Sequence, residues 1–362
     1  MSIDILAQMT STDHEQVIFC QNKEVGLKAI IAIHNTTLGP ALGGTRMWAY
    51  ASEDQALNDV LRLSRGMTYK AAISGLQLGG GKAVIIGDPK KDKKPGYFEA
   101  YGRFVHTLMG RYITAEDVGT SVADMEAVLT QTPHVVGTKQ SHGGSGDPSP
   151  FTAKGVFLGL KACAKKVYGT DDLSGKRVAV QGIGNVGYNL VKLLKNEGAK
   201  VTVADIDSER VELVRKEFGV EAVSDEQILH LDCDIFSPCA LGGVVNDQTL
   251  PNFRCQIIAG GANNQLARRE HAAELKKRGI LYAPDYLINA GGLINVSLEA
   301  TGGYNEQKSL EMIEQIYVSM TKLIEIAEQK NITTAEAADF LVEEKLKAEP
   351  CKRIYLPSCE LN

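Results

Sequence analysis

The stretch that decides the fold is Val178-Ala-Val-Gln-Gly182-Ile-Gly184-Asn-Val-Gly187, in which a short apolar run leads into three glycines at fixed spacing. The first glycine permits a tight turn, and the second lets the backbone approach a bound phosphate. The third lets the following helix pack closely on the strand. A pyrophosphate then binds at the N-terminus of that helix, where free N–H groups and the helix dipole favour an anion. The stretch therefore predicts a dinucleotide-binding domain.

Asp205 adds a second part of the same signature. It lies 18 residues after Gly187, at the end of the next predicted strand, where an acid can hydrogen-bond the adenosine ribose. Its negative charge repels the 2′-phosphate of NADP, which favours NAD as the cofactor. The alternative is a glycine-rich turn that binds nothing, but strand, turn, helix and acid occur here in the order that binding requires. The predicted cofactor-binding residues of this motif are Gly182, Gly184, Asn185, Val186, Gly187 and Asp205.

Strands and helices alternate on both sides of the motif. This alternation predicts a parallel, doubly wound sheet, that is, a Rossmann domain. The segment before it, 141–150, is rich in Gly, Pro and Ser and has no apolar residue, so it is predicted to be a hinge. The predicted elements of this domain are helices over 151–168 and 185–197 and strands over 177–181, 200–204, 234–237, 256–259 and 280–283.

The residues before the hinge predict a second domain of mixed strands and helices. Ser52 and Gln55 form a capping box at the start of a helix. Residues 38–44 are predicted to be a turn-rich connection because Gly and Pro dominate them. The remaining predicted elements are strands over 15–20, 27–34 and 82–86, a helix over 97–109 and a helix that begins near Ser121.

We therefore expect an α/β chain with two domains. Residues 1–140 form the substrate and catalytic domain, and residues 150–330 form the NAD-binding domain. The tail is helical, with apolar residues between Leu310 and Ala327 on one face and a last helix from about Thr334. We expect the helices of about 330–362 to pack back against the first domain.

Composition limits the partners of the chain. A net charge of −5 over 362 residues argues against a nucleic-acid binder, and no apolar run is long enough to span a membrane. The seven cysteines are scattered without a CxxC pair, so neither a disulfide framework nor a metal site is expected. Free thiols suit a reducing compartment, and we expect a cytoplasmic protein.

Two lysines flank a glycine run in the first domain, at Lys70 and in Gly79-Gly-Gly-Lys82. A phosphate-binding P-loop is excluded, because Leu76 stands where that motif needs glycine and Ala83 where it needs Ser or Thr. Two surface lysines beside a flexible loop are the simplest alternative. Three consecutive glycines argue against it, since their entropic cost is high unless the backbone must approach something closely.

The segment Thr114-Ala-Glu-Asp-Val-Gly119 places a carboxylate near the end of a strand. A lysine and an aspartate in one cleft share proton transfers when burial and neighbouring charge separate their pKa values. Spacing alone does not decide between Glu116 and Asp117.

Six motifs, in this order along the chain, resemble those of the amino-acid dehydrogenases that act on glutamate, leucine, valine and phenylalanine. The likeness covers nearly the whole chain and is strongest to the leucine-specific members. It implies reversible oxidative deamination of an L-amino acid to its 2-oxo acid and ammonium, with NAD. The motifs are Gly39-Pro-Ala-Leu-Gly-Gly-Thr-Arg46, Gly79-Gly-Gly-Lys82, Thr114-Ala-Glu-Asp-Val-Gly119, Gly182-Ile-Gly-Asn-Val-Gly187, Gly261-Ala-Asn-Asn-Gln-Leu266 and Asn289-Ala-Gly-Gly292.

The resemblance also implies residue roles. Lys70 holds the substrate carboxylate with the backbone near Gly43 and Gly44, Lys82 activates the attacking water, and Asp117 handles protons at the amino group. Two further residues, Thr152 and Asn264, match positions near the nicotinamide, and Asn264 also matches a substrate contact. The two domains are expected to close on a cleft between them.

The side-chain pocket implied by the resemblance is apolar. Glutamate-specific relatives carry a lysine at the position of Leu42, which offers a glutamate side chain no partner here. Ala115, Leu293 and Val296 match the other pocket positions, and together they suit leucine, then isoleucine and valine. Leu293 is larger than the valine expected in a leucine enzyme, so phenylalanine, tryptophan and valine remain alternatives.

Two rival functions remain on sequence grounds. A hydroxy-acid dehydrogenase relies on a catalytic histidine paired with an acid, and none of the seven histidines lies in a glycine-rich catalytic setting. His142, in the predicted hinge, is the strongest candidate, but it is interpreted as a solvated loop residue. A non-catalytic NAD-binding protein keeps the glycines but has no use for Lys70, Lys82 and Asp117 together. Homo-oligomers are usual in the resembled family, and Trp48 is a candidate interface residue.

Overall fold

The computed structural model describes residues 4–300 and 303–348, and the chain divides into two compact units. The first consists of the chain up to Gly146, Val296–Asn305 and the chain from Val342. The second consists of Asp147–Asn295 and Glu306–Leu341. The first boundary thus falls inside the segment predicted as a hinge. Among the described residues, every helix is too short or too polar to cross a bilayer.

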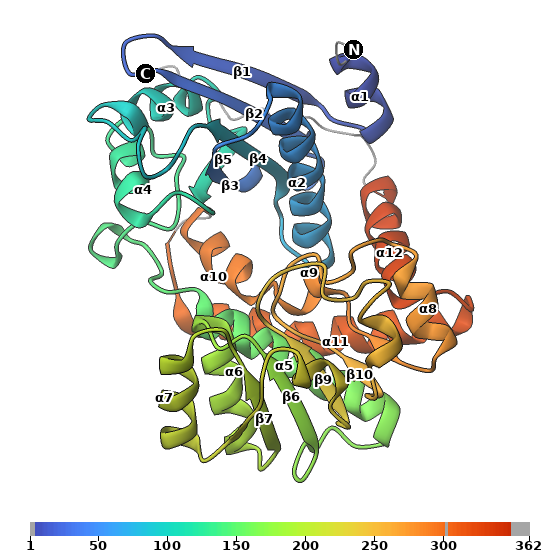
Figure 1. The fold of residues 1–362 in the computed structure, drawn as a ribbon. Coiled ribbons are helices and arrows are strands. Elements are labelled where there is room, and N and C mark those ends of the chain that lie inside the picture. The colour runs from blue at the N-terminus through green and yellow to red at the C-terminus, as the bar shows by residue number, and fades with distance from the viewer. Residues whose placement is uncertain (1–3, 301–302, 349–362) are drawn as a thin grey trace. The chain divides into compact units, whose positions relative to one another are not determined.

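The first unit is built on a five-stranded mixed sheet of order β1-β2-β4-β3-β5 (Figure 1). β2 is antiparallel to β1 and to β4, whereas β4, β3 and β5 run parallel. The elements are α1 (Ile5–Thr12), β1 (Gln16–Asn22), β2 (Leu27–Asn35), β3 (Ala41–Trp48), α2 (Glu53–Ile73), β4 (Gly79–Ile86), α3 (Tyr97–His106), β5 (Tyr112–Glu116) and α4 (Val122–Leu129).

Both faces of this sheet are buried. Ile30 and Ala32 of β2 pack in a cluster with the apolar face of α2, whereas Ile31 and Ile33 pack in a second cluster with α3 and α4. Figure 1 shows α2 on one side of the strands and α3 and α4 on the other. This alternation follows from the two-residue period of a strand, and it explains why β2 is almost entirely buried.

Two glycine-rich stretches that looked like turns are strands. The prediction of a turn-rich connection over 38–44 was wrong from Ala41 onward, where β3 begins, and β4 begins at Gly79 rather than at Lys82. The reason is close strand approach. A Cβ atom on Gly43 would lie 1.7 Å from the carbonyl oxygen of Gly81 in the neighbouring strand.

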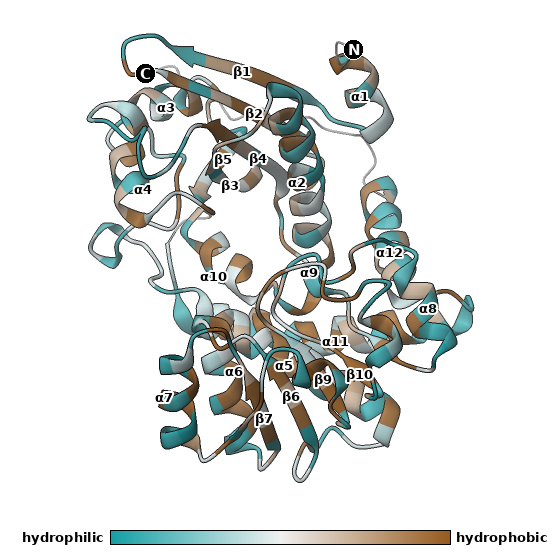
Figure 2. Ribbon diagram, in the orientation of Figure 1, coloured by the Kyte–Doolittle hydropathy of each residue, from teal (hydrophilic) through white to brown (hydrophobic). Residues whose placement is uncertain are grey.

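The second unit contains a parallel six-stranded sheet of order β11-β10-β9-β6-β7-β8, which is the predicted doubly wound Rossmann topology. Figure 2 shows apolar strands β6, β7 and β9 and a hydrophilic α7. β8 was not predicted. The elements that follow the hinge are α5 (Ser149–Tyr168), β6 (Arg177–Gln181), α6 (Asn185–Asn196), β7 (Lys200–Ala204), α7 (Ser208–Phe218), β8 (Glu221–Ala222), β9 (Ile235–Pro238), β10 (Ile257–Ile258), α8 (His271–Lys277), β11 (Leu281–Tyr282), α9 (Asp285–Ile288), α10 (Gly291–Ala300), α11 (Glu306–Gln329) and α12 (Thr334–Ala348). α10 and α12 each begin in the second unit and end in the first.

The helical tail differs from the sequence expectation. α11 packs along α5, and Glu306–Leu341 belongs to the second unit, so only the part of the predicted tail from Val342 belongs to the first. The apolar face of α11 is buried at Ile313, Met320 and Leu323, and burial against α5 gives it a partner within its own unit. Residues 349–362 of the predicted tail lie outside the described residues.

Candidate active site

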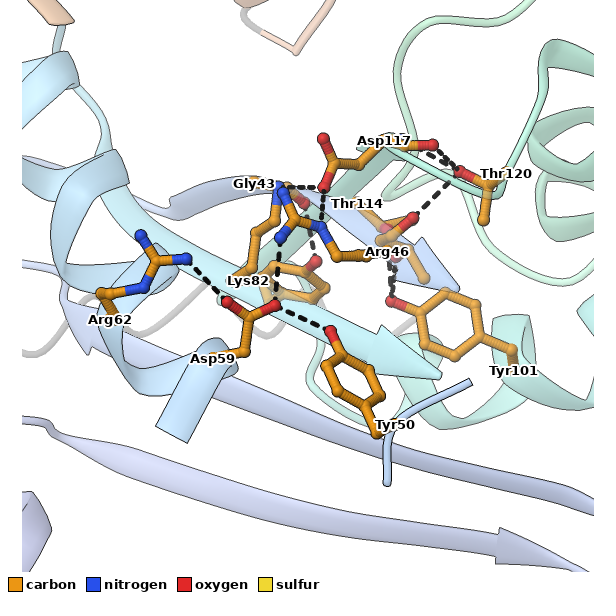
Figure 3. A network of polar contacts seen from close by, with 12 residues as sticks. Gly43, Arg46, Tyr50, Asp59, Arg62, Lys82, Tyr101, Thr114, Asp117 and Thr120 are labelled. Carbon is orange, nitrogen blue, oxygen red and sulfur yellow. Dashed lines mark hydrogen bonds and ion pairs between the residues drawn. The ribbon is translucent and has the colours of Figure 1, made fainter. Parts of the chain in front are cut away.

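A cluster of paired charges joins β3, β4 and the residue that follows β5. Lys82 Nζ lies 2.9 Å from Asp117 Oδ2, and Arg46 Nε lies 3.0 Å from the same oxygen. The Lys82 side chain is only 7% exposed and that of Asp117 is 24% exposed. In Figure 3 both cations converge on one carboxylate oxygen, while the other oxygen points away from them. Among the described residues, no hydrogen-bond partner is found for that second oxygen, Oδ1.

Glycines make this convergence possible. Gly44 pairs with Ala115 across β3 and β5, and a Cβ atom on Gly44 would lie 2.5 Å from the Glu116 carbonyl oxygen and 3.0 Å from the Asp117 Cβ. A larger residue would push the end of β5 away from β3. The site therefore needs glycine at position 44 because protein atoms occupy the space of a side chain.

The two central groups titrate away from their ordinary ranges. Burial lowers the pKa of Lys82, and the neighbouring Asp117 carboxylate offsets this only in part. Burial alone raises the pKa of Asp117, but the Lys82 and Arg46 cations outweigh it and hold that pKa below its ordinary value. Asp117 thus stays ionised, whereas Lys82 loses its proton more readily than an exposed lysine. Lys82 is the better base of the pair.

The structure separates the two candidate acids. Asp117 is half-buried against Lys82, whereas Glu116 is exposed. Thr120 holds the Asp117 backbone, because its hydroxyl accepts a hydrogen bond from the Asp117 N–H at 2.9 Å and donates to the Thr45 carbonyl. The geometry favours Asp117.

Lys70 lies in the last turn of α2, half-buried, and the same turn packs on the glycine run of β4. A Cβ atom on Gly80 would lie 2.0 Å from the Thr68 backbone nitrogen, two residues before Lys70. The glycines of β4 therefore let α2 approach the strand that carries Lys82. This contact supports the sequence prediction that the glycine run serves close backbone approach.

The glycine-rich turn of the second unit has the geometry of an anion site. Gly182 has a φ of +92° and packs against Ala240, just beyond β9, and a Cβ on Gly187 would lie 2.0 Å from the Gly182 carbonyl oxygen. Gly184 differs, because the nearest atom to a Cβ there is 3.7 Å away. No side chain caps the N-terminus of α6 at Gly184. Its N–H groups are therefore available to a phosphate, and these residues fit a dinucleotide.

Asp205 lies beside that turn. Its Oδ2 accepts a hydrogen bond from the Ile183 N–H at 2.5 Å, and its Oδ1 accepts one from the Asp207 N–H at 2.9 Å. The turn lies where β6 and β9 meet, the point at which the strand order reverses. Ligands of doubly wound sheets bind at this point.

Comparison with known proteins identifies the family. Residues 14–134 match the model of the Glu/Leu/Phe/Val dehydrogenase dimerisation domain, and residues 143–211 and 202–349 match that of Glutamate/Leucine/Phenylalanine/Valine dehydrogenase. The chain belongs to this dehydrogenase family. It is an amino-acid dehydrogenase, an oxidoreductase that deaminates an amino acid with a nicotinamide cofactor, and the alternative of a hydroxy-acid dehydrogenase is rejected.

Individual relatives of this dehydrogenase agree over nearly its full length. Leucine dehydrogenase from Geobacillus stearothermophilus is 56% identical over 345 residues, covering 95% of this chain and 94% of the relative. Phenylalanine dehydrogenase from Thermoactinomyces intermedius is 52% identical over 346 residues, covering 95% and 94%. The crystal structure of L-tryptophan dehydrogenase from Nostoc punctiforme is 45% identical, with a TM-score of 0.86, and the alignment covers 96% of this chain and 100% of that one.

The remaining predicted residues of the dehydrogenase lie as follows. Thr152 is half-buried in α5 and donates to the Pro148 carbonyl, while Asn264 is exposed with a φ of +53°. At the turn, Asn185 is exposed and Val186 half-buried in the first turn of α6. The pocket residues are Leu42, buried in β3, Ala115, half-buried in β5, and Leu293 and Val296, both half-buried in α10.

Sequence reasoning missed the outer part of the charge cluster. Arg46 NH1 lies 3.0 Å from Asp59 Oδ2, which also accepts a hydrogen bond from the Tyr50 hydroxyl at 2.8 Å. Arg46 ends the motif Gly39–Arg46 and lies two residues after Gly44. Residues two apart in a strand share a face, so the sequence could have placed Arg46 on the same face as Gly44. Asp59 carried no such signal, because it is one polar residue among several on a long helix.

Proposed function

We propose that the chain catalyses the reversible NAD-dependent oxidative deamination of branched aliphatic L-amino acids, with leucine preferred. The observation that carries the chemistry is the buried Lys82–Asp117 pair, whose contact of 2.9 Å joins a lysine of lowered pKa to an ionised acid. The observation that carries the substrate class is Leu42, an apolar side chain, 2% exposed, at the position where glutamate-specific relatives have a lysine.

Lys70 and the Gly43–Gly44 backbone hold the substrate carboxylate in this proposal. Tyr112 supports the arrangement, because its hydroxyl donates to the Gly43 carbonyl at 2.6 Å. The C=O and N–H of a trans peptide point in opposite directions, so the Gly44 N–H faces away from Tyr112. In this proposal the Gly44 N–H donates to the substrate carboxylate, and Lys70 supplies the positive charge.

Asp117 and Lys82 divide the proton chemistry. Asp117 Oδ1, turned away from the two cations, accepts a hydrogen bond from the substrate amino group. A nicotinamide cofactor, when bound at the glycine-rich turn, would supply the acceptor for the hydride of the α-carbon. Lys82 in its neutral form then takes a proton from the water that adds to the iminium carbon, and returns it as ammonia departs. Thr152 and Asn264 are the residues we assign to the surroundings of the nicotinamide.

We assign NAD rather than NADP because of Asp205. Its carboxylate is fixed by two backbone N–H groups beside the glycine-rich turn, where it suits a ribose hydroxyl and repels a 2′-phosphate. We also propose a homo-oligomer, since residues 14–134 match a model described as a dimerisation domain. The buried free thiols suit a reducing compartment, and we place the enzyme in the cytoplasm.

The preference for leucine rests on the apolar pocket positions and on the leucine dehydrogenases at 52–56% identity. The test is kcat/KM for leucine, valine, phenylalanine, tryptophan and glutamate, measured side by side with NAD. We expect leucine to lead, with valine within about 10- to 200-fold, because one methylene changes binding by only ~1 to 3 kcal/mol. An aromatic substrate in first place overturns the leucine assignment, and glutamate in first place overturns the pocket argument.

A further inference from the structure

Arg46 uses two different edges of its guanidinium to join two carboxylates. Its Nε contacts Asp117 and its NH1 contacts Asp59, each at 3.0 Å. Figure 3 shows the resulting chain, which runs from Lys82 through Asp117 and Arg46 to Asp59. The Arg46 side chain is 23% exposed and that of Asp59 16% exposed, so solvent screens these contacts only partly.

Asp59 is itself held in place from two further directions. The Tyr50 hydroxyl donates to its Oδ2 at 2.8 Å, and Arg62 NH2 lies 2.8 Å from its Oδ1. Burial alone raises the pKa of Asp59, but these donors and Arg46 lower it below the ordinary value. Asp59 is therefore an anion at neutral pH, and it fixes the far edge of Arg46.

We propose that Arg46 and Asp59 are positioning residues for the proton chemistry. Arg46 orients the Asp117 carboxylate so that Oδ1 faces the substrate, and Asp59 balances the charge of Arg46, which controls how easily Lys82 loses its proton. This inference rests on the proposed role of Lys82 as the base. It adds two residues to the reaction that have no direct contact with the reacting atoms.

The sign of each charge gives the direction of each effect. Among the charge contacts that the structure describes, Lys82 pairs with Asp117, Arg46 on β3 joins Asp117 to Asp59 on α2, and Arg62 on α2 pairs with Asp59. Tyr112 on β5 is uncharged, since burial raises its pKa to about 12. Loss of the Asp59 anion leaves the cluster more positive, which favours neutral Lys82. Loss of the Arg46 cation leaves it more negative, which favours protonated Lys82.

The experiment is the pH dependence of kcat/KM for leucine oxidation in Asp59→Asn and Arg46→Gln. We expect the acidic limb of the profile to move to lower pH in Asp59→Asn and to higher pH in Arg46→Gln, each by roughly half a pH unit or more. A purely structural role predicts no shift, or shifts of the same sign. Either of those results overturns the inference.

Three further variants separate the explanations. Glu15→Gln removes another half-buried carboxylate of the same unit, one that pairs with Arg111 at 3.3 Å, and should leave the limb in place. Arg46→Lys keeps the charge but cannot span two carboxylates, so kcat should fall while the limb moves little. If Arg46→Gln does not fold, Arg62→Gln replaces it, because Arg62 is exposed and is a more distant cation that pairs with Asp59. Its acidic limb of kcat/KM should move to higher pH by a smaller amount.

Lys82→Ala distinguishes failure of this inference from failure of the proposed function. If Lys82→Ala retains more than about a tenth of wild-type kcat, Lys82 is not the base and the proposed chemistry fails. If Lys82→Ala is inactive but the acidic limb of kcat/KM lies at the wild-type pH in both Asp59→Asn and Arg46→Gln, the proposed base stands and only the positioning role of Arg46 and Asp59 is rejected.

Discussion

The two units of this dehydrogenase both build their sites around glycines, but for opposite reasons. In the first unit, the space beside Gly43 and Gly44 is filled by neighbouring strands, with a carbonyl oxygen 1.7 Å from a Cβ placed on Gly43. In the second, the space beside Gly184 is open to 3.7 Å. The first site uses glycine so that charged side chains converge, and the second uses it so that a ligand reaches the backbone. A glycine in a motif therefore indicates close packing at Gly43, Gly44 and Gly187, and ligand approach at Gly184.

The largest expected effect is that of Lys82→Ala in the first unit. Turnover should fall by the ~10²- to 10⁴-fold typical of a lost general base, because the variant removes the buried lysine of lowered pKa that contacts Asp117. Binding of NADH, followed by fluorescence titration, should stay near wild type because the second unit supplies that site. Lys28→Ala, at an exposed surface pair, is the control and should be fully active.

Asp117→Asn should have the next largest effect. The amide keeps the shape but removes the negative charge that accepts from the substrate amino group and pairs with Lys82 and Arg46, so kcat should fall by about 100-fold. Glu116→Gln, at the exposed neighbour, should change kcat by less than about twofold. Steady-state kinetics on both variants measure which acid acts in catalysis. A large fall in kcat for Glu116→Gln with little change for Asp117→Asn would assign that role to Glu116.

Gly184→Ala against Gly187→Ala sharpens the comparison within the second unit. The nearest protein atom to a Cβ on Gly184 lies 3.7 Å away, an ordinary van der Waals contact, so in Gly184→Ala Tm should be unchanged while KM for NAD rises by about tenfold. Gly187→Ala places a Cβ 2.0 Å from the Gly182 carbonyl oxygen and should lower Tm as well. Calorimetry and cofactor kinetics measure the two effects. Equal loss of Tm in both variants contradicts an open site at Gly184.

Asp205→Ala tests the one side chain that selects the cofactor in the second unit. Removing the carboxylate removes the repulsion of a 2′-phosphate, so the ratio of kcat/KM for NAD to that for NADP should fall by about tenfold. Comparable use of both cofactors by the wild type would contradict the assignment of NAD. A silent variant would show that another group discriminates between them.

The smallest expected effect is on stability at acid pH, and it concerns the first unit. His14 and His34 are buried together with ring centroids 4.8 Å apart, and burial lowers the pKa of His34 to about 3. The unfolded chain takes up a proton below about pH 6.5. The folded chain does so only near pH 3. The contribution of His34 is therefore complete above pH 6.5 and declines as pH falls toward 3, by at most ~1.4 kcal/mol per pH unit.

Hydrogen exchange of β2 and α2 against β6 and α6, at pH 7 and pH 5, measures this difference between the units. The first pair should lose more protection on acidification. The buried histidine of the second unit, His271, has Asp247 Oδ1 at 3.1 Å as a compensating partner. Equal losses in the two units would show that the histidine pair does not control acid stability.

Local sequence patterns were enough to predict most strands and helices of the second unit. The strands β6 and β7 were predicted to the residue, and the helices α5 and α6 within two residues, because apolar periodicity and the glycine fingerprint are written in consecutive residues. Doubly wound topology then followed, since alternating strands and helices leave little choice. The family and its six motifs were accessible for the same reason.

Only the tertiary structure decided the rest. Residues 41–44 read as a turn because their glycines suit one, yet they form a strand, since the carbonyl oxygen that fills the place of a side chain comes from a segment about 40 residues away. The same holds for the series of charge contacts from Lys82 to Asp59, which joins residues of two strands, the residue that follows a third strand, and a helix. Close packing and charge pairing depend on distances between segments, whereas a sequence orders only neighbours along the chain.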